Sequence, residues 1–151
     1  MPSSAEHAYH VRLRPVSTAP RAARDALAEA CADWGAPGFL EAGGLVLSEL
    51  VSNAVVHSGR QTGLDVGVEL SLRDGSLLMR VHDGGSDLPQ MAAETQGAAA
   101  AATGAGGYGL GIVSKLTESW GVDTDSHGSG KTVWCVLRER PAGLGGAAPR
   151  R

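Results

Sequence analysis

Residues 45–59 read LVLSELVSNAVVHSG, and the other expected elements are arranged around this stretch. At about 100° per residue, its apolar side chains share one half of a helix. Glu49, Asn53 and His57 follow at intervals of four residues, so we expect them along one line beside the apolar half. A carboxylate can take up a proton and an amide oxygen can bind a hard cation, so Glu49 and Asn53 could act on one ligand. The same residue types are also common at the solvated edge of an ordinary helix.

The rest of the chain predicts an α+β fold. Residues 64–72 alternate apolar and polar side chains, as half-buried strands do, and Asp74-Gly75 is a strong hairpin signal. The order strand, helix, helix, strand, strand differs from a Rossmann sheet. It favours a two-layer α/β sandwich, a mixed and mostly antiparallel sheet with about three helices on one face. The expected elements are strands at 9–16, 64–72, 76–82, 120–124 and 132–137, with helices from 18 to 34, from 39 to 57 and from 106 to 120.

Length and composition predict one folded domain between unstructured ends. A chain of 151 residues can bury a real core, which we expect over residues 9–140. Residues 1–8 are expected to be a disordered start, and residues 141–151, rich in Gly, Ala, Pro and Arg, a disordered tail. Residues 86–106 are rich in Gly, Ala and short polar side chains, so we expect a mobile lid there, with some helix.

Charge and hydropathy argue against several functional classes. The net charge is −3 and there is no long basic block, which argues against nucleic acid or an anionic membrane as partner. We find no apolar run long enough to span a bilayer and no signal peptide, so we expect a cytoplasmic protein. Cys31 and Cys135 fall in a predicted helix and a predicted strand, which favours buried, reduced thiols over a disulfide framework.

Two nucleotide-binding motifs occur in part, and their contexts argue against both. Gly128-Ser129-Gly130-Lys131-Thr132 resembles the end of a P-loop, but Asp125 stands where the first glycine is needed, and a strand follows instead of a helix. Gly104-x-Gly106-x-x-Gly109 spells a dinucleotide fingerprint, yet an alanine-rich segment precedes it where a buried strand is required. Zinc sites and Ser-His-Asp hydrolases are disfavoured too, since neither a ligand pair at the usual spacing nor a nucleophile elbow occurs.

Further features could face one ligand together with the Glu–Asn pair. Asp83 offers a carboxylate at the end of a strand, and Gly85 would let a flat ring lie against its backbone. Gly107-Tyr108-Gly109-Leu110-Gly111 opens a helix with exposed N–H groups, a suitable site for phosphates. Thr132 places a hydroxyl at the start of the last strand. Taken singly, each has an ordinary explanation as a turn, a hinge or a strand residue.

Together and in this order, these features resemble the nucleotide-binding boxes of the GHKL family, which includes gyrase B, Hsp90, histidine kinases and MutL. The resemblance covers residues 9–138. It is strongest to the small bacterial anti-sigma factor serine/threonine kinases and their actinobacterial relatives, in which a pair like Trp120-Gly121 also recurs. The matching segments are Glu49-x-x-x-Asn53 for the N box, Asp83-x-Gly85 and Gly107-x-Gly109-Leu110-Gly111 for the two glycine boxes, and Gly130-Lys131-Thr132 for the threonine box.

The resemblance implies binding of ATP with Mg²⁺ and a role for each matching residue. Asp83 would accept a hydrogen bond from the adenine amino group, with support from Thr132, and Gly85 would let the base lie close. Asn53 would ligate Mg²⁺ at the phosphates, and Glu49 would be the general base acting on a water or a serine hydroxyl. The residues that would cradle the phosphates beneath the lid are Gly107, Tyr108, Gly109, Leu110 and Gly111.

The resemblance also implies a protein serine/threonine kinase that binds a sigma factor and phosphorylates an anti-sigma-factor antagonist. Small relatives are commonly homodimers, so a homodimer is possible. A second function stays open, a non-catalytic, ATP-gated binding module. It is favoured by two departures from the family pattern, because Asp87 replaces the usual later glycine of the first glycine box and Tyr108 stands where many relatives have arginine. We interpret His57 as structural and Lys131 as a solvated turn residue.

Overall fold

The structure, a computed structural model, describes residues 7–59, 63–84, 107–124 and 130–139. The lid expected at 86–106 and the tail at 141–151 lie outside the described residues, whereas His7 and Ala8 of the expected loose start already belong to the first strand. The elements are β1 (His7–Leu13), α1 (Ala19–Trp34), the 3-10 turn η1 (Pro37–Phe39), α2 (Leu40–Ala54), the π-helical turn η2 (Val55–Gly59), β2 (Val66–Arg73), β3 (Ser76–Asp83), α6 (Gly107–Leu116), β4 (Ser119–Thr124) and β5 (Lys131–Arg138).

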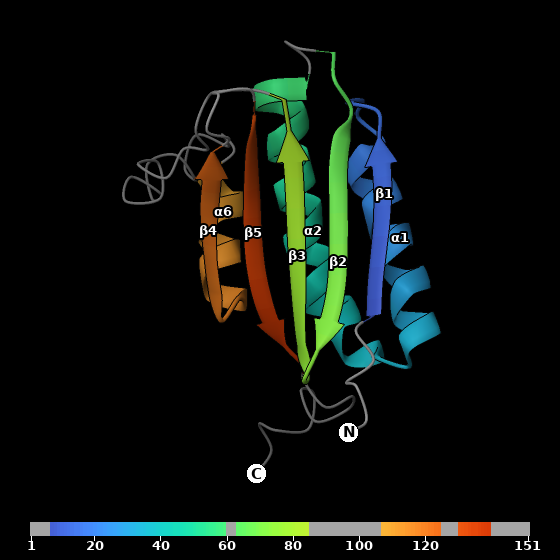
Figure 1. The fold of residues 1–151 in the computed structure, drawn as a ribbon. Coiled ribbons are helices and arrows are strands. Elements are labelled where there is room, and N and C mark those ends of the chain that lie inside the picture. Colours follow the sequence, from blue (N-terminus) through green and yellow to red (C-terminus); the bar gives the residue numbers. More distant parts are fainter. Residues whose placement is uncertain (1–6, 60–62, 85–106, 125–129, 140–151) are drawn as a thin grey trace.

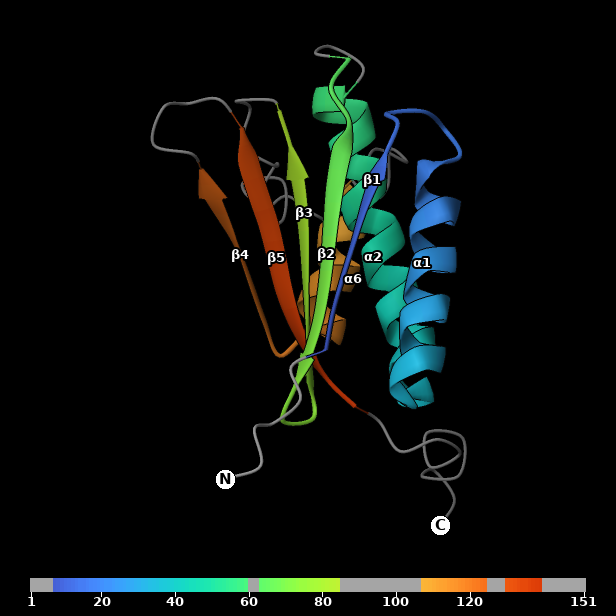
Figure 2. The same cartoon turned by 45° about the vertical axis from the view of Figure 1, so that its right-hand side comes forward.

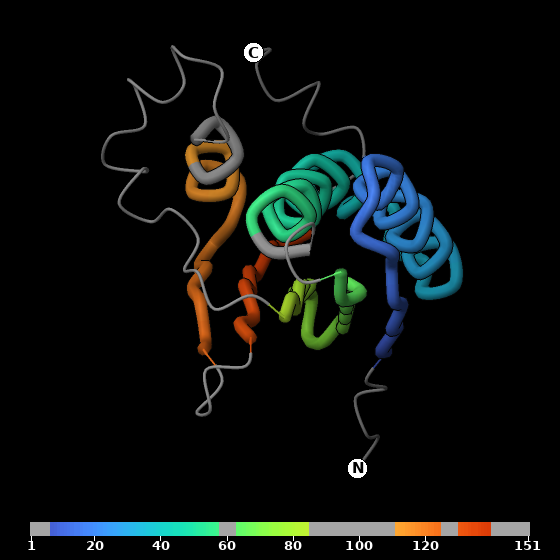
Figure 3. Tube along the Cα trace, turned by 90° about the horizontal axis from the view of Figure 1, so that it is seen from above, coloured from blue at the N-terminus to red at the C-terminus, as the bar shows by residue number. Residues whose placement is uncertain are grey.

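The strands form one five-stranded sheet with the order β1-β2-β3-β5-β4 (Figure 1). The helices α1, α2 and α6 lie on one face of it (Figures 2 and 3), which confirms the expected two-layer α+β class. All neighbouring pairs among the described strands are antiparallel. The expected mixed sheet would also contain parallel pairs, and none is found among these strands. After β3, helix α6 runs back along the sheet, so β4 has the same direction as β3. β5 then lies between β3 and β4 and runs opposite to both.

The hairpin between β2 and β3 follows the Asp-Gly signal in the sequence. Arg73 pairs with Ser76, and both intervening residues have a positive φ, 50° at Asp74 and 75° at Gly75. Two consecutive residues of this kind form a type I′ turn, whose twist matches that of the flanking strands. The expected hairpin is thus confirmed. It sets the register of β3, which ends at Asp83.

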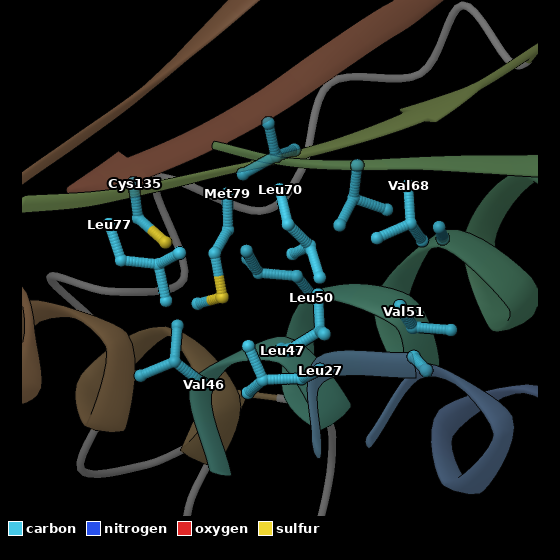
Figure 4. Packing of buried hydrophobic residues seen from close by; sticks show 14 of the residues in the cluster. Leu27, Val46, Leu47, Leu50, Val51, Val68, Leu70, Leu77, Met79 and Cys135 are labelled. Atoms are coloured by element: carbon cyan, nitrogen blue, oxygen red, sulfur yellow. The ribbon is translucent and has the colours of Figure 1, made fainter. Parts of the chain in front are cut away.

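Every second side chain of the central strands points toward the helices and is buried. In β5 the odd-numbered positions from 131 to 137 are buried, and the even-numbered ones up to 136 are partly exposed. Leu77 of β3 belongs to the same core as Leu47 of α2 and Leu27 of α1 (Figure 4). Complete burial of one such side chain contributes about 1.5–3 kcal/mol. Both cysteines are buried and free, as expected.

α2 is the central helix of its layer and contacts both α1 and α6 (Figure 3). Gly43 allows α1 to approach closely, since a Cβ there would lie 3.1 Å from Leu27 Cδ2. A hydrogen bond of 3.1 Å from Arg24 Nη1 to Ser48 Oγ also joins α1 to α2. The expected single helix over 39–57 is divided, because the α-helix ends at Ala54 and continues as the π-helical turn η2.

Among the described residues, one helical stretch is long and apolar enough to cross a membrane by length and composition alone. It is Pro37–His57, which has 21 residues and contains an 18-residue window with a mean hydropathy of 1.4. This corrects the sequence-based statement that no apolar run reaches that length. Half of an 18-residue window within this stretch is buried inside the fold, and the core helix of a globular domain meets the same criteria. Packing of α2 against the sheet therefore accounts for its apolar composition.

Candidate functional site

The candidate residues come from elements that end or begin toward one end of the molecule. β3 ends there with Asp83, β5 begins with Lys131, α2 passes into η2, and α6 begins with Gly107 on the same side (Figure 1). Because β3 and β5 are antiparallel neighbours, the last residue of β3 lies opposite the first residue of β5. Segments that are far apart in the sequence are thereby brought close together.

Asp83 lies on the helix-facing side of the sheet in a buried ion pair with Lys131. The two residues are register partners, and Lys131 Nζ lies 2.9 Å from Asp83 Oδ1. Only 2% of the Asp83 side chain and 3% of the Lys131 side chain are exposed. Burial of a carboxylate is costly unless a charge partner and hydrogen bonds compensate it, and Lys131 provides the charge. The interpretation of Lys131 as a solvated turn residue is therefore wrong.

Thr132 lies on the opposite face of the sheet. Its register partner is the exposed His82, and neighbouring residues of a strand point to opposite faces. The structure therefore does not bring the Thr132 hydroxyl to Asp83, as its expected supporting role requires. Lys131, the preceding residue, holds that position. The cause is the register between β3 and β5, which pairs residue 83 with residue 131.

Glu49 and Asn53 lie within α2 and are both partly exposed. The interval of four residues places their side chains on the same side of the helix, one turn apart. Leu45, one further turn toward the start of α2, is 46% exposed, so this side of the helix is turned away from the core. His57 lies beyond the α-helical part, in η2, and is partly buried. The α-helical spacing that predicts Glu49, Asn53 and His57 along one line therefore ends before His57.

The second glycine box begins α6. Its backbone is helical from Gly107, so the first-turn N–H groups of residues 107–110 lack partners within the helix. Such N–H groups bind anions, which fits the expected phosphate contacts. The side chains of Tyr108 and Leu110, as well as Gly85 and Asp87, lie outside what the structure describes. A Cβ at Gly111 would meet no described atom within 4 Å, so packing in the described part does not require a glycine there.

Gly121 and Trp120, noted in the sequence only as part of a resemblance, have distinct structural roles. A Cβ at Gly121 would lie 2.7 Å from Cζ2 of Trp134, so the missing side chain lets the Trp134 ring lie across β4. Trp120 Nε1 donates a hydrogen bond of 3.1 Å to Ser114 Oγ. This bond joins β4 to α6. The Trp120 contact helps to position the helix that begins with the second glycine box.

The protein contribution to a cation site is small in the described part of the chain. No three or more His, Cys, Asp or Glu residues are grouped to hold a metal ion within residues 7–59, 63–84, 107–124 and 130–139. Mg²⁺ at a nucleotide is bound mostly by phosphate oxygens and water, and needs only one or two protein oxygens. The partly exposed Asn53 amide fits that requirement.

A groove of about 510 Å³ lies on the other face of the sheet, at the same end. Its lining includes Arg12, Gly67 and His82, which form one cross-strand row. The groove does not include Asp83, whose side chain points to the helix side. It is therefore separate from the candidate site.

These features define a class of protein. GHKL-type ATPase domains typically have a five-stranded antiparallel sheet, three helices on one face of it and a central helix with a Glu–Asn pair. The chain belongs to the histidine kinase-like ATPase domain family, whose model matches residues 5–137. The resemblance noted in the sequence is confirmed by this match.

One similar solved structure contains the RsbU and RsbW domains of Rv1364c from Mycobacterium tuberculosis. The TM-score is 0.64 and the sequence identity is 24%, so this similarity shows the fold. The alignment covers 89% of this chain but 33% of the other chain, so this chain spans a third of its length. No curated protein matches the chain.

Proposed function

We propose that the chain is an ATP- and Mg²⁺-dependent protein serine/threonine kinase of the anti-sigma factor type. The observation that carries the proposal is the position of the Glu49–Asn53 pair. Both side chains are partly exposed on the central helix of a histidine kinase-like ATPase domain. A general base that acts on a protein substrate must be reachable from outside, and Glu49 meets this condition.

In this proposal the chain's residues bind and orient ATP and accept one proton. Asp83 binds the base, and the first-turn N–H groups of α6 bind the phosphates. The Asn53 oxygen would hold Mg²⁺, which would supply charge compensation at the phosphates. Glu49 takes the proton of a Ser or Thr hydroxyl while that oxygen forms a bond to the γ-phosphorus and the bond to ADP breaks.

The proposed partners are a sigma factor, which the chain would hold, and an anti-sigma-factor antagonist, which it would phosphorylate, in the cytoplasm. The fold similarity to a protein described by its RsbU and RsbW domains supports this choice. A homodimer is part of the same proposal.

The second candidate function is an ATP-gated binding module without phosphotransfer. The replacement of a usual glycine by Asp87 and of a usual arginine by Tyr108 agrees with it.

Glu49→Gln distinguishes the two functions. Glu41→Gln is the matched control, because Glu41 lies on the same helix, is exposed and belongs to its first turn. ATP binding is measured by calorimetry, and transfer of labelled phosphate is measured with anti-sigma-factor antagonists from the same genome. For a kinase, only Glu49→Gln abolishes transfer, and it keeps ATP binding. If Glu49→Gln regulates the partner as well as the wild type does, the module is correct and the kinase is wrong.

A further inference from the structure

The Lys131–Asp83 pair lies where the proposed function places the nucleotide base, yet that function assigns Lys131 no role. We propose that Lys131 competes with the base for Asp83 and so sets the nucleotide affinity of the site. Without nucleotide, the ammonium group takes the place of the base amino group at the carboxylate. This inference rests on the proposed function, because it assumes that Asp83 binds the base.

Access of a nucleotide base to Asp83 is blocked in the structure. Asp83 and Lys131 are 2% and 3% exposed, so a base cannot reach the carboxylate unless a neighbouring group moves. The adjacent core residues Val81 and Val133 are 0% and 7% exposed and are held in the sheet. Lys131 has a flexible four-carbon stem at the first position of β5, where the strand begins. Its side chain can therefore move away from the carboxylate without displacing Val81 or Val133.

The two partners that compete for the Asp83 carboxylate differ in strength. The Lys131 ammonium donates a charge-assisted hydrogen bond across 2.9 Å, whereas a base amino group is a neutral donor. A base that binds Asp83 must therefore replace the stronger partner or share the carboxylate with it. In either case part of the free energy of nucleotide binding offsets the weakening of the Lys131–Asp83 interaction. The nucleotide affinity is therefore lower than it would be without this ion pair.

Stability alone does not account for the Lys131–Asp83 pair. Replacing a buried ion pair by well-packed apolar side chains is often neutral or stabilising. The pair extends the buried apolar rows of Leu77, Met79 and Val81 in β3 and of Val133 and Cys135 in β5. A charged pair at the rim of this core is explained by a role in binding.

The test compares ATP binding with Mg²⁺ by calorimetry in the wild type, Lys131→Thr and the control Arg80→Thr. Arg80 is exposed on the opposite face of β3, so its replacement removes the same charge without touching the pair. We expect Lys131→Thr to tighten ATP binding roughly tenfold, because the base no longer replaces a charged donor. Arg80→Thr is expected to bind as the wild type does. The double variant Lys131→Thr with Asp83→Asn is expected to bind ATP more weakly than Lys131→Thr alone, because it lacks the carboxylate that binds the base.

Two further measurements keep the proposal testable if Lys131→Thr folds poorly. Lys131→Arg retains the ion pair and can form a forked one, so ATP binding is expected to weaken relative to the wild type. The rise in melting temperature with ATP is expected to be larger for Lys131→Thr than for the wild type. Equal or weaker ATP binding by folded Lys131→Thr, with an unchanged control, would overturn the inference and leave the proposed function intact. If neither the wild type nor any variant binds ATP at millimolar concentration, the proposed function itself fails.

Discussion

Gly111→Ala is expected to stabilise the domain and weaken ATP binding at the same time. Gly111 is the fifth residue of α6, and a Cβ there would meet no described atom within 4 Å. Alanine in a helix interior is more favourable than glycine by about 0.8–1.0 kcal/mol. For a domain of this size, such a gain raises the melting temperature by about 2–4 °C.

The same methyl group is expected to reduce ATP affinity. It would stand where the proposed phosphates approach the first turn of α6 and would hold them away from the N–H groups. Loss of one hydrogen bond to a charged group costs about 1.5–3 kcal/mol, a loss of roughly tenfold to a hundredfold in affinity. Thermal unfolding and calorimetry with ATP and Mg²⁺ measure the two effects on the same protein.

Gly44→Ala is the matched control for Gly111→Ala. Gly44 is also inside a helix, and a Cβ there would lie 3.9 Å from Arg24 Cδ, an ordinary contact. This variant is expected to be stabilised by a similar amount, with unchanged ATP binding. If Gly111→Ala binds ATP as the wild type does, position 111 is not at the phosphates, and the proposed role of the second glycine box is wrong there. Equal losses of affinity in both variants would point to a general effect on the fold.

Three further predictions concern packing and pH. Gly43→Ala is expected to destabilise the domain by about 1–3 kcal/mol in denaturant unfolding, since its Cβ would lie 3.1 Å from Leu27 Cδ2 in the core. Gly121→Ala is expected to displace the Trp134 ring, seen as a shift in tryptophan fluorescence, with a smaller loss of stability because the ring is partly exposed. Burial raises the pKa of the Cys135 thiol from 9.0 to about 12. The buried neutral thiol therefore contributes its full stability below pH 9, and this contribution declines between pH 9 and about pH 12. Denaturant unfolding at several pH values measures the decline. A Cys135→Ala variant is expected to show a smaller decline, and the rest comes in part from the Cys31 thiol, whose pKa burial also raises.

Features that depend on local periodicity could be predicted from the sequence. The alternation in residues 64–72 and the Asp74-Gly75 turn predicted β2 and its hairpin, and both are present. α1 ends at Trp34 as expected, since Gly35 takes a left-handed conformation with φ of 63°. Glu49 and Asn53 were placed correctly on one side of α2 because four residues make about one helical turn.

The face on which Thr132 and Lys131 lie could not be predicted in this way. The segment TVWCVL is apolar at both its odd and its even positions, so its composition does not show which face is buried. The answer depends on the register between β3 and β5, and the paired residues 83 and 131 are 48 positions apart. A shift of one residue in this register exchanges the two faces. The sequence predicts a last strand that begins at Thr132, so it does not identify Lys131 as a strand residue.

The different burial of the site residues determines which variants can report on function. Glu49 and Asn53 are partly exposed, so their replacement changes chemistry with little effect on the fold. Asp83 is different, because removal of one member of a buried ion pair costs about 3–5 kcal/mol, a large part of a typical domain's 5–15 kcal/mol. A loss of ATP binding in Asp83→Asn alone would therefore not separate a lost contact from a damaged site. The combination of Lys131→Thr with Asp83→Asn removes both charges together, so its ATP affinity reports the contact between Asp83 and the base.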